Sequence, residues 1–324
     1  TEITTEAQRK TSTTARQLVD KHALTQNFPV FKAGPSPNTA LWLESVRRTG
    51  YDRDGKSAAL NAVRFESNAE DMPNRVMRPN DPRPGFSRPR IGRVINEYGG
   101  ETVVTYKPAA GDCATGTGLP GKTDKAGLKA NTRLCYPSFW SPDPEAEAID
   151  WFHKYVVDSI EELPNVDGAF ATKTAYEYKN PGWKLADGEF TKKSTRTYSQ
   201  FAGVEQTTVI TGADNGDINS KRSKAVTRYF RGMGDTVSMK DIAGVEIAKA
   251  REEFAGRIAE ELDYDEANAA DTDWVSRSVT VPVATELAHR DRDDGLDPLY
   301  AWRVTEPAEI AYTKSSGTNS DDTR

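Results

Sequence analysis

The clearest hydrophobic pattern in the chain lies between Tyr198 and Asp235. Its first half alternates between two sets of side chains, Val204, Gln206, Thr208 and Ile210 in one set and Glu205, Thr207 and Val209 in the other. A period of two residues is typical of a β-strand, because successive side chains point to opposite faces. A polar, glycine-containing connector follows, and then a β-branched and aromatic run from Lys224 to Phe230. We therefore predict a β-hairpin here.

Runs of the same kind recur along the chain at a spacing of roughly 8 to 15 residues, with turn residues between them. This pattern predicts an all-β fold of many short antiparallel strands and hairpins. We expect Asn180, Pro181 and Gly182 to end the strand that begins near Ala169, because proline removes a ladder donor. The predicted strands are Ala40–Thr49, Leu60–Glu66, Ile91–Asn96, Glu101–Lys107, Tyr155–Glu161, Ala169–Tyr178, Glu261–Asp265, Trp274–Val283 and Leu299–Thr305.

One internal segment departs from the strand pattern. Ile247, Ala250, Phe254 and Ile258 recur at roughly helical spacing among residues that favour helices. We therefore predict one short helical insertion near residues 247–258. The two ends of the chain are polar, so we expect residues 1–38 to be extended and partly disordered. Residues 313–324 are rich in Ser, Thr and Asp, and we expect them to form a disordered tail.

The overall charge limits the classes of partner. The 324 residues include 43 Lys and Arg against 49 Asp and Glu, a formal net charge of −6. Binding to phosphates needs a basic face, so we expect no nucleic-acid partner. The sequence has no apolar run of about 18 residues, and we therefore expect no transmembrane segment.

The two cysteines, Cys113 and Cys135, lie 22 residues apart in an irregular stretch rich in Gly, Thr and Lys. The simplest interpretation is a disulfide in a secreted or cell-surface protein, which would stabilise the fold by about 3 kcal/mol on the chain-entropy model. Two unpaired thiols in a cytosolic protein are the alternative. A zinc site is less favoured, because zinc takes about four ligands and neither cysteine belongs to a CxxC pair.

The residues that usually carry catalysis are sparse. The three histidines, His22, His153 and His289, are scattered, and His153 stands among aromatic residues, which indicates packing. No HExxH or GxSxG motif is present. Residues 116–123 (GTGLPGKT) satisfy the spacing of a phosphate-binding loop, but no apolar strand precedes them, so we expect no nucleotide site. We predict a non-enzymatic protein with no cofactor and no metal site.

Acidic and aromatic residues leave two alternatives open. The aspartates near Gly295 and Gly55 do not complete a calcium-binding loop and are interpreted as solvated turns. A glycoside hydrolase remains the less favoured alternative, because its two carboxylates are paired in space and not in sequence. Trp183 and Trp302, each followed by a basic residue, are candidates for stacking on carbohydrate. Cross-strand packing is the more usual role of such aromatics.

Several phrases, in order, resemble the large secreted RHS/YD-repeat proteins of actinobacteria. Residues 40–50 (ALWLESVRRTG), 131–140 (NTRLCYPSFW) and 150–159 (DWFHKYVVDS) carry the resemblance, together with Arg93–Tyr106, the opening hairpin and residues 294–304 (DGLDPLYAWRV). The ordered set spans about residues 40 to 305. The chain departs from the family between Lys240 and Ala255, and where SRSVTVPV replaces an expected NDPW phrase near Arg277.

This resemblance implies a fold and a role. In the family, hairpins build a curved sheet that forms part of a hollow β-cocoon, which encloses a toxin in polymorphic toxins. Residues 39–312 would then form a segment of the shell, in contact with neighbouring segments of the same polypeptide and with an enclosed toxin. The family's self-cleaving motif is absent, so no catalytic residue is carried over. A cell-surface adhesion or carbohydrate-binding module, in contact with the cell wall or a glycan, is the alternative.

Overall fold

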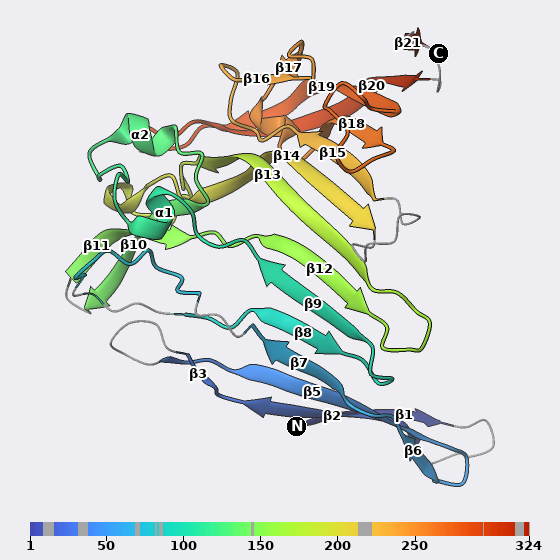
Figure 1. Cartoon of the computed structure of the whole chain (residues 1–324). Coiled ribbons are helices and arrows are strands. Elements are labelled where there is room, and N and C mark those ends of the chain that lie inside the picture. Colours follow the sequence, from blue (N-terminus) through green and yellow to red (C-terminus); the bar gives the residue numbers. More distant parts are fainter. Residues whose placement is uncertain are drawn as a thin grey trace. The chain divides into compact units, whose positions relative to one another are not determined.

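The computed structural model describes residues 1–8, 16–31, 38–68, 72–81, 83, 87–143, 146–212, 222–293, 295–314 and 321–323. The chain divides into two compact units, and Figure 1 colours it along the sequence. The first unit comprises Thr1–Arg75, Pro82–Lys107 and Val156–Lys173, and the second comprises Val76–Asp81, Pro108–Tyr155 and Thr174–Arg324. Antiparallel strands dominate each unit, which confirms the predicted all-β class.

The first unit is an antiparallel sheet whose strands follow one another in chain order. Across the sheet they are β1 (Glu2–Gln8), β2 (Arg16–Asn27), β5 (Trp42–Tyr51), β7 (Val63–Ser67), β8 (Ile91–Ile95), β9 (Glu101–Tyr106) and β12 (Val157–Leu163). The short strand β6 (Ser57–Ala59) also pairs with β5, and β3 (Val30–Phe31) pairs with β4 (Asn38–Thr39). The turn between β8 and β9 is held by Asn96 Oδ1, which accepts hydrogen bonds from the amides of Tyr98 and Gly100.

The sheet of the second unit also follows chain order. Its strands are β13 (Thr172–Lys184), β14 (Gln200–Gly212), β15 (Ser223–Tyr229), β18 (Ile258–Tyr264), β19 (Ser276–Arg290), β20 (Leu299–Lys314) and β21 (Asp321–Thr323). Two hairpins add to it, β10 (Cys135–Asp143) with β11 (Ala146–His153) and β16 (Ser238–Lys240) with β17 (Glu246–Lys249). Helices are short: α1 (Asp112–Thr115), α2 (Lys125–Lys129) and the 3-10 turns η1 (Lys193–Thr195) and η2 (Glu252–Phe254).

The hairpin predicted from the two-residue period is confirmed as β14 and β15. Their register places Thr208 opposite Val226, and Val226 is in turn opposite Leu262 on β18. All three of these side chains are buried, so they share the covered face of the sheet. The alternation in the sequence therefore corresponds to the two faces of this strand, and Gln206 and Thr208 of the first set are buried.

The two units differ in the amount of apolar core they contain. The second unit has three buried clusters, centred on the disulfide, on Val226 with Leu262, and on Phe230 with Phe254. Among the described residues of the first unit, the buried apolar side chains are Met72 and Ile95 alone. The first unit is thus a sheet in which most apolar side chains are only partly buried.

The helix predicted near residues 247–258 is wrong in extent. That segment forms strand β17, the single 3-10 turn η2 and the start of β18. Pairing of Met239 with Ala248 draws the beginning of the segment into a hairpin. Gly256 adopts φ +81°, a left-handed conformation that a right-handed helix does not accommodate. Tertiary pairing therefore overrides the local helix propensity.

The strand predicted to end at Tyr178 instead continues to Lys184 as β13. Asn180 takes a left-handed φ of +51°, which asparagine tolerates better than most residues, and its carbonyl accepts a hydrogen bond from Arg231 at 2.8 Å. Pro181 and Gly182 are buried beyond this irregularity. The Asn-Pro-Gly sequence therefore bends the strand without ending it.

The two ends of the chain contribute strands to the units. Within residues 1–38, β1 pairs with β2, and β2 pairs with β5 from Asp20 opposite Gly50 to Asn27 opposite Trp42. Residues 9–15 and 32–37 of this segment lie outside the described residues. At the other end β20 reaches Lys314, and most of the predicted disordered tail, residues 315–320 and 324, also lies outside the described residues.

Candidate functional site

The predicted disulfide joins Cys113 to Cys135, with their Cα atoms 5.9 Å apart. Cys113 lies on α1 and Cys135 begins β10, so the bond closes a loop that contains α2. Both sulfurs pack in a buried cluster with Val76, Leu128 and Trp151. The bond therefore holds an otherwise irregular loop in place within the second unit and forms part of the core of that unit.

Trp183 is buried, so of the two roles considered from the sequence it packs in the core and is not available to stack on a carbohydrate. Its side chain is 1% exposed, its indole nitrogen donates a hydrogen bond to the carbonyl of Arg133 at 2.9 Å, and its ring stacks on Tyr136 at 4.6 Å. These partners lie about 50 residues away in sequence, in the region of the disulfide loop. Trp183 thus attaches β13 to that loop.

Trp302 lies partly exposed near the free end of the β19–β20 hairpin. The ring of Tyr300 lies 5.4 Å from it, and the guanidinium of Arg251 lies 5.1 Å from its centre. His289 in turn contacts Tyr300, and its Nδ1 forms a hydrogen bond with Glu286 at 2.8 Å. Within the described residues no ring contact connects Trp302 with Trp183, so the two candidates do not form one platform.

The segment that resembles a phosphate-binding loop does not follow a strand, as the sequence indicated. Residues 116–123 connect α1 with α2, and no strand leads into them. Asp124 accepts a hydrogen bond from Gly127 and so caps α2. Across the part of the chain that the structure describes, no group of three or more His, Cys, Asp or Glu side chains is placed to hold a metal ion.

A groove that the sequence did not indicate lies in the first unit, between the start of β5 and the end of β7. We call it the Trp42 groove; its lining includes Asn27, Trp42, Glu44, Arg64, Phe65 and Glu66, and its volume is about 480 Å³. β5 and β7 pair only at Ser45 with Arg64 and Val46 with Val63, so the strands separate beyond that point. Trp42 spans the gap, because its indole nitrogen donates to the carbonyl of Phe65 at 2.9 Å.

Polar groups in the Trp42 groove are incompletely used within the chain. The amide nitrogen of Asn27 donates to Glu44, whereas the buried Oδ1 of Asn27 has no hydrogen-bond partner among the described residues. Arg64 is exposed and, in the described part of the chain, forms no ion pair. The groove therefore contains one hydrogen-bond acceptor, Asn27 Oδ1, and the donors of the Arg64 side chain, which a ligand could bind.

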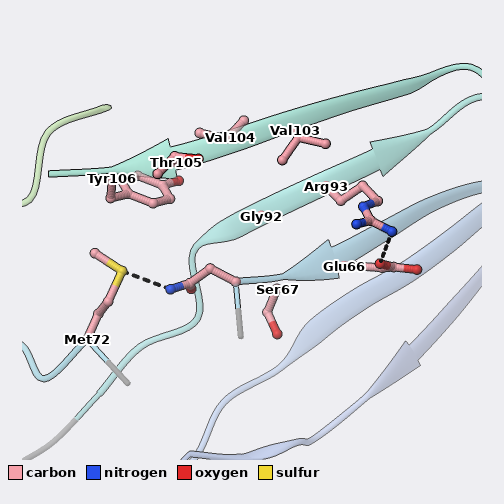
Figure 2. A pocket seen from close by; sticks show the side chains of 10 residues that line it. Glu66, Ser67, Met72, Gly92, Arg93, Val103, Val104, Thr105 and Tyr106 are labelled. Carbon is pink, nitrogen blue, oxygen red and sulfur yellow. Dashed lines mark hydrogen bonds and ion pairs between the residues drawn. The ribbon is translucent and has the colours of Figure 1, made fainter. Parts of the chain in front are cut away.

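A second pocket of about 310 Å³ adjoins the Trp42 groove and shares Glu66 and Ser67 with it (Figure 2). The guanidinium of Arg93 lies 3.8 Å from Glu66 and 3.4 Å from Glu101. The hydroxyl of Tyr106 donates to the carbonyl of Ile91 at 3.0 Å, and burial raises the pKa of this phenol. The polar groups of this pocket are thus largely paired with one another.

The most densely charged site lies on the covered face of the second unit. Glu260 is fully buried; one carboxylate oxygen accepts from Arg277 at 2.7 Å and the other from the amide of Ile242 at 2.7 Å. Arg277 also binds Asp241 at 2.6 Å. Burial raises the pKa of Glu260 despite these partners. The cluster holds the β16–β17 hairpin on the sheet and has no open cavity beside it among the described pockets.

No helix of the described residues is long and apolar enough to span a membrane. No protein-family model matches the chain, and no curated protein matches it. Among solved structures, the crystal structure of TcdB2-TccC3 is 10% identical, with a TM-score of 0.41 over 88% of this chain and 15% of that chain. The Tc holotoxin pore of Photorhabdus luminescens is 11% identical, with a TM-score of 0.41 over 88% of this chain and 14% of that chain. The present chain therefore spans about 15% of the length of the first of these structures.

Proposed function

We propose that the chain is a non-enzymatic wall segment of a secreted RHS/YD-repeat shell that encapsulates or presents a toxin or effector. The observation that carries this proposal is the strand order, in which each unit adds its strands in the order of the chain. A sheet that grows this way lengthens along one direction, as a wall does. The ordered phrases of the sequence supply the family to which such a wall would belong.

The thinness of the first unit supports the same proposal. An independent domain of its size would need a substantial apolar core, because burial of apolar surface is the main driving force of folding. In its described residues only Met72 and Ile95 are buried apolar side chains. A wall segment does not need a filled core of its own, since it is supported by the neighbouring segments with which it forms the shell.

The disulfide supports export to an oxidising compartment, because such bonds are rare in cytosolic proteins. The partners we propose are neighbouring segments of the same polypeptide and an enclosed protein. The lack of enzymatic activity is likewise part of the proposal. A screen for hydrolysis of polysaccharides and peptides would test it, and turnover that is lost in a single Asp or Glu variant would contradict it.

Cryo-electron microscopy of the purified chain tests the wall itself. The expected result is that the sheet of the first unit is one layer thick and has an uncovered face. A compact particle in which a second layer covers both sheets would overturn the proposal, because such a particle would be a closed domain. Preparations at several protein concentrations, compared by size-exclusion chromatography, would show whether the chain associates with itself.

A further inference from the structure

We propose that the Trp42 groove binds a short neutral oligosaccharide. The inference is independent of the wall function, since the groove lies entirely within the first unit. Its volume of about 480 Å³ falls inside the range of roughly 300–1,000 Å³ that is usual for ligand sites. The groove is open on one side and is therefore suited to the end of a chain-like ligand.

The indole of Trp42 supplies an oriented apolar surface. Its nitrogen is fixed on the carbonyl of Phe65, and the ring has no other ring contact in the part of the chain that the structure describes. Trp42 is partly exposed where it lines the groove. The apolar C–H face of a sugar ring packs on such a surface, whereas the indole of Trp183 is buried and that of Trp302 is already contacted by Tyr300 and Arg251.

The lining of the groove also includes hydrogen-bond donors and acceptors. Asn27 Oδ1 is a buried acceptor without a partner among the described residues, and Arg64 carries donors without an ion pair there. Glu44 and Glu66 add acceptors on the same lining. A sugar hydroxyl both donates and accepts, so a polyol can satisfy such a mixture, while a purely acceptor or purely donor ligand cannot.

The charge of the groove selects a neutral ligand. Its lining includes one arginine, Arg64, and two glutamates, Glu44 and Glu66, so negative charges outnumber positive ones. A phosphate or carboxylate in the groove would therefore meet more like charges than opposite charges on the lining. Binding of an anionic glycan, a nucleotide or a nucleic acid is therefore disfavoured. A neutral sugar carries no charge and is not repelled by these carboxylates.

The test begins with a glycan array of neutral and acidic oligosaccharides probed with the full chain. The best-bound neutral oligosaccharide is then titrated calorimetrically into the wild type and the variants. Trp42→Leu and Arg64→Ala should each weaken binding roughly tenfold or more, since each removes one main contact of the sugar. The matched controls are Trp302→Ala and Arg53→Ala, which change the same residue types outside the groove and should leave the affinity unaltered.

Trp42→Leu could lose binding because it unfolds, which a lower melting temperature would reveal. In that case the result for Arg64→Ala tests the groove, because Arg64 is exposed and its loss leaves the fold intact. Absence of binding to every glycan on the array would overturn the inference. Binding that survives both groove variants would also overturn it, and loss in Trp302→Ala would instead place the sugar on the β19–β20 hairpin. A preference for acidic over neutral glycans would contradict the charge argument.

Discussion

At the scale of single residues, Trp183 and Trp302 illustrate how position in the fold decides the role of a side chain. Both precede a basic residue, and both are candidates for sugar stacking from the sequence alone. The structure buries Trp183 against Tyr136 and leaves Trp302 partly exposed. The sequence could not distinguish them, because the partners of Trp183 lie about 50 residues away along the chain.

The first prediction uses this contrast. Trp183→Ala should destabilise the fold by about 3–5 kcal/mol, because it removes a fully buried ring and leaves the carbonyl of Arg133 without its donor. Trp302→Ala, the matched control, should cost about 1 kcal/mol. Chemical denaturation followed by circular dichroism measures both. Equal costs for the two substitutions would contradict the packing described here.

The second prediction concerns pH. Burial raises the pKa of Glu260 in the folded chain above that in the unfolded chain, so the folded state binds this proton more tightly. The stability that this proton contributes therefore increases as the pH falls from neutral through the folded pKa. Glu260→Gln removes that contribution, and the wild type should gain stability relative to the variant between about pH 7 and pH 4.

Glu246 supplies a control of opposite sign. Hydrogen bonds from Ser238 and Lys249 lower the pKa of this exposed carboxyl, so its contribution is present at neutral pH and is lost as the pH falls through its pKa. The stability of the wild type relative to Glu246→Gln should therefore stay constant from neutral pH down to about the ordinary carboxyl pKa of 4.5 and then decrease below it. Urea denaturation at several pH values measures both differences. If the stability difference from the wild type changed with pH in the same direction for both variants, the opposite pKa shifts of Glu260 and Glu246 would be contradicted.

At the scale of elements, the disulfide loop depends on its cross-link. The loop contains only the short helices α1 and α2, and its one buried aliphatic residue on α2 is Leu128. Reduction should lower the free energy of unfolding by about 3 kcal/mol on the chain-entropy model. Cys113→Ser with Cys135→Ser should match the reduced wild type and should not respond further to dithiothreitol. A reductant effect of the same size in the double variant would refute this.

A fourth prediction concerns the β7–β8 ladder. A Cβ on Gly92 would lie 2.6 Å from the Cα of Asn68, so Gly92→Ala must push two backbones apart. We expect a loss of about 1–3 kcal/mol. Gly50 on β5 has open space around it, and Gly50→Ala should change stability by less than about 1 kcal/mol. Thermal melting compares the stability of the two variants. Indistinguishable melting temperatures would contradict the close approach of the Gly92 and Asn68 backbones.

Local patterns predicted the strands well where the alternation was clear. The β14–β15 hairpin and the β8–β9 hairpin follow from a two-residue period and from turn residues. The helix expected near residues 247–258 is reduced to the 3-10 turn Glu252–Phe254 because Ala248 pairs with Met239, and that contact is not visible in helix propensity. The Trp42 groove was not predictable either, since it arises where β5 and β7 separate beyond Val46, and no local signal marks such a separation.

At the scale of the whole molecule, the two units should differ in local stability. The second unit carries three buried clusters, whereas the described part of the first unit buries only Met72 and Ile95 as apolar side chains. Amide hydrogen exchange followed by mass spectrometry should show faster exchange in β8 and β9 than in β15 and β18. Equal protection in the two pairs of strands would mean that the first unit is stabilised by contacts other than apolar burial.

The chain-order arrangement of strands has a consequence for how the protein is made. In each sheet a strand pairs mainly with the strand that came shortly before it, as β9 pairs with β8 and β15 pairs with β14. Contacts between segments close in sequence form sooner, because less loop entropy is lost when they meet. A polypeptide that emerges gradually, from a ribosome or through a membrane, can therefore add one strand after another to an existing edge. Such a sheet does not need its last residues in order to begin folding.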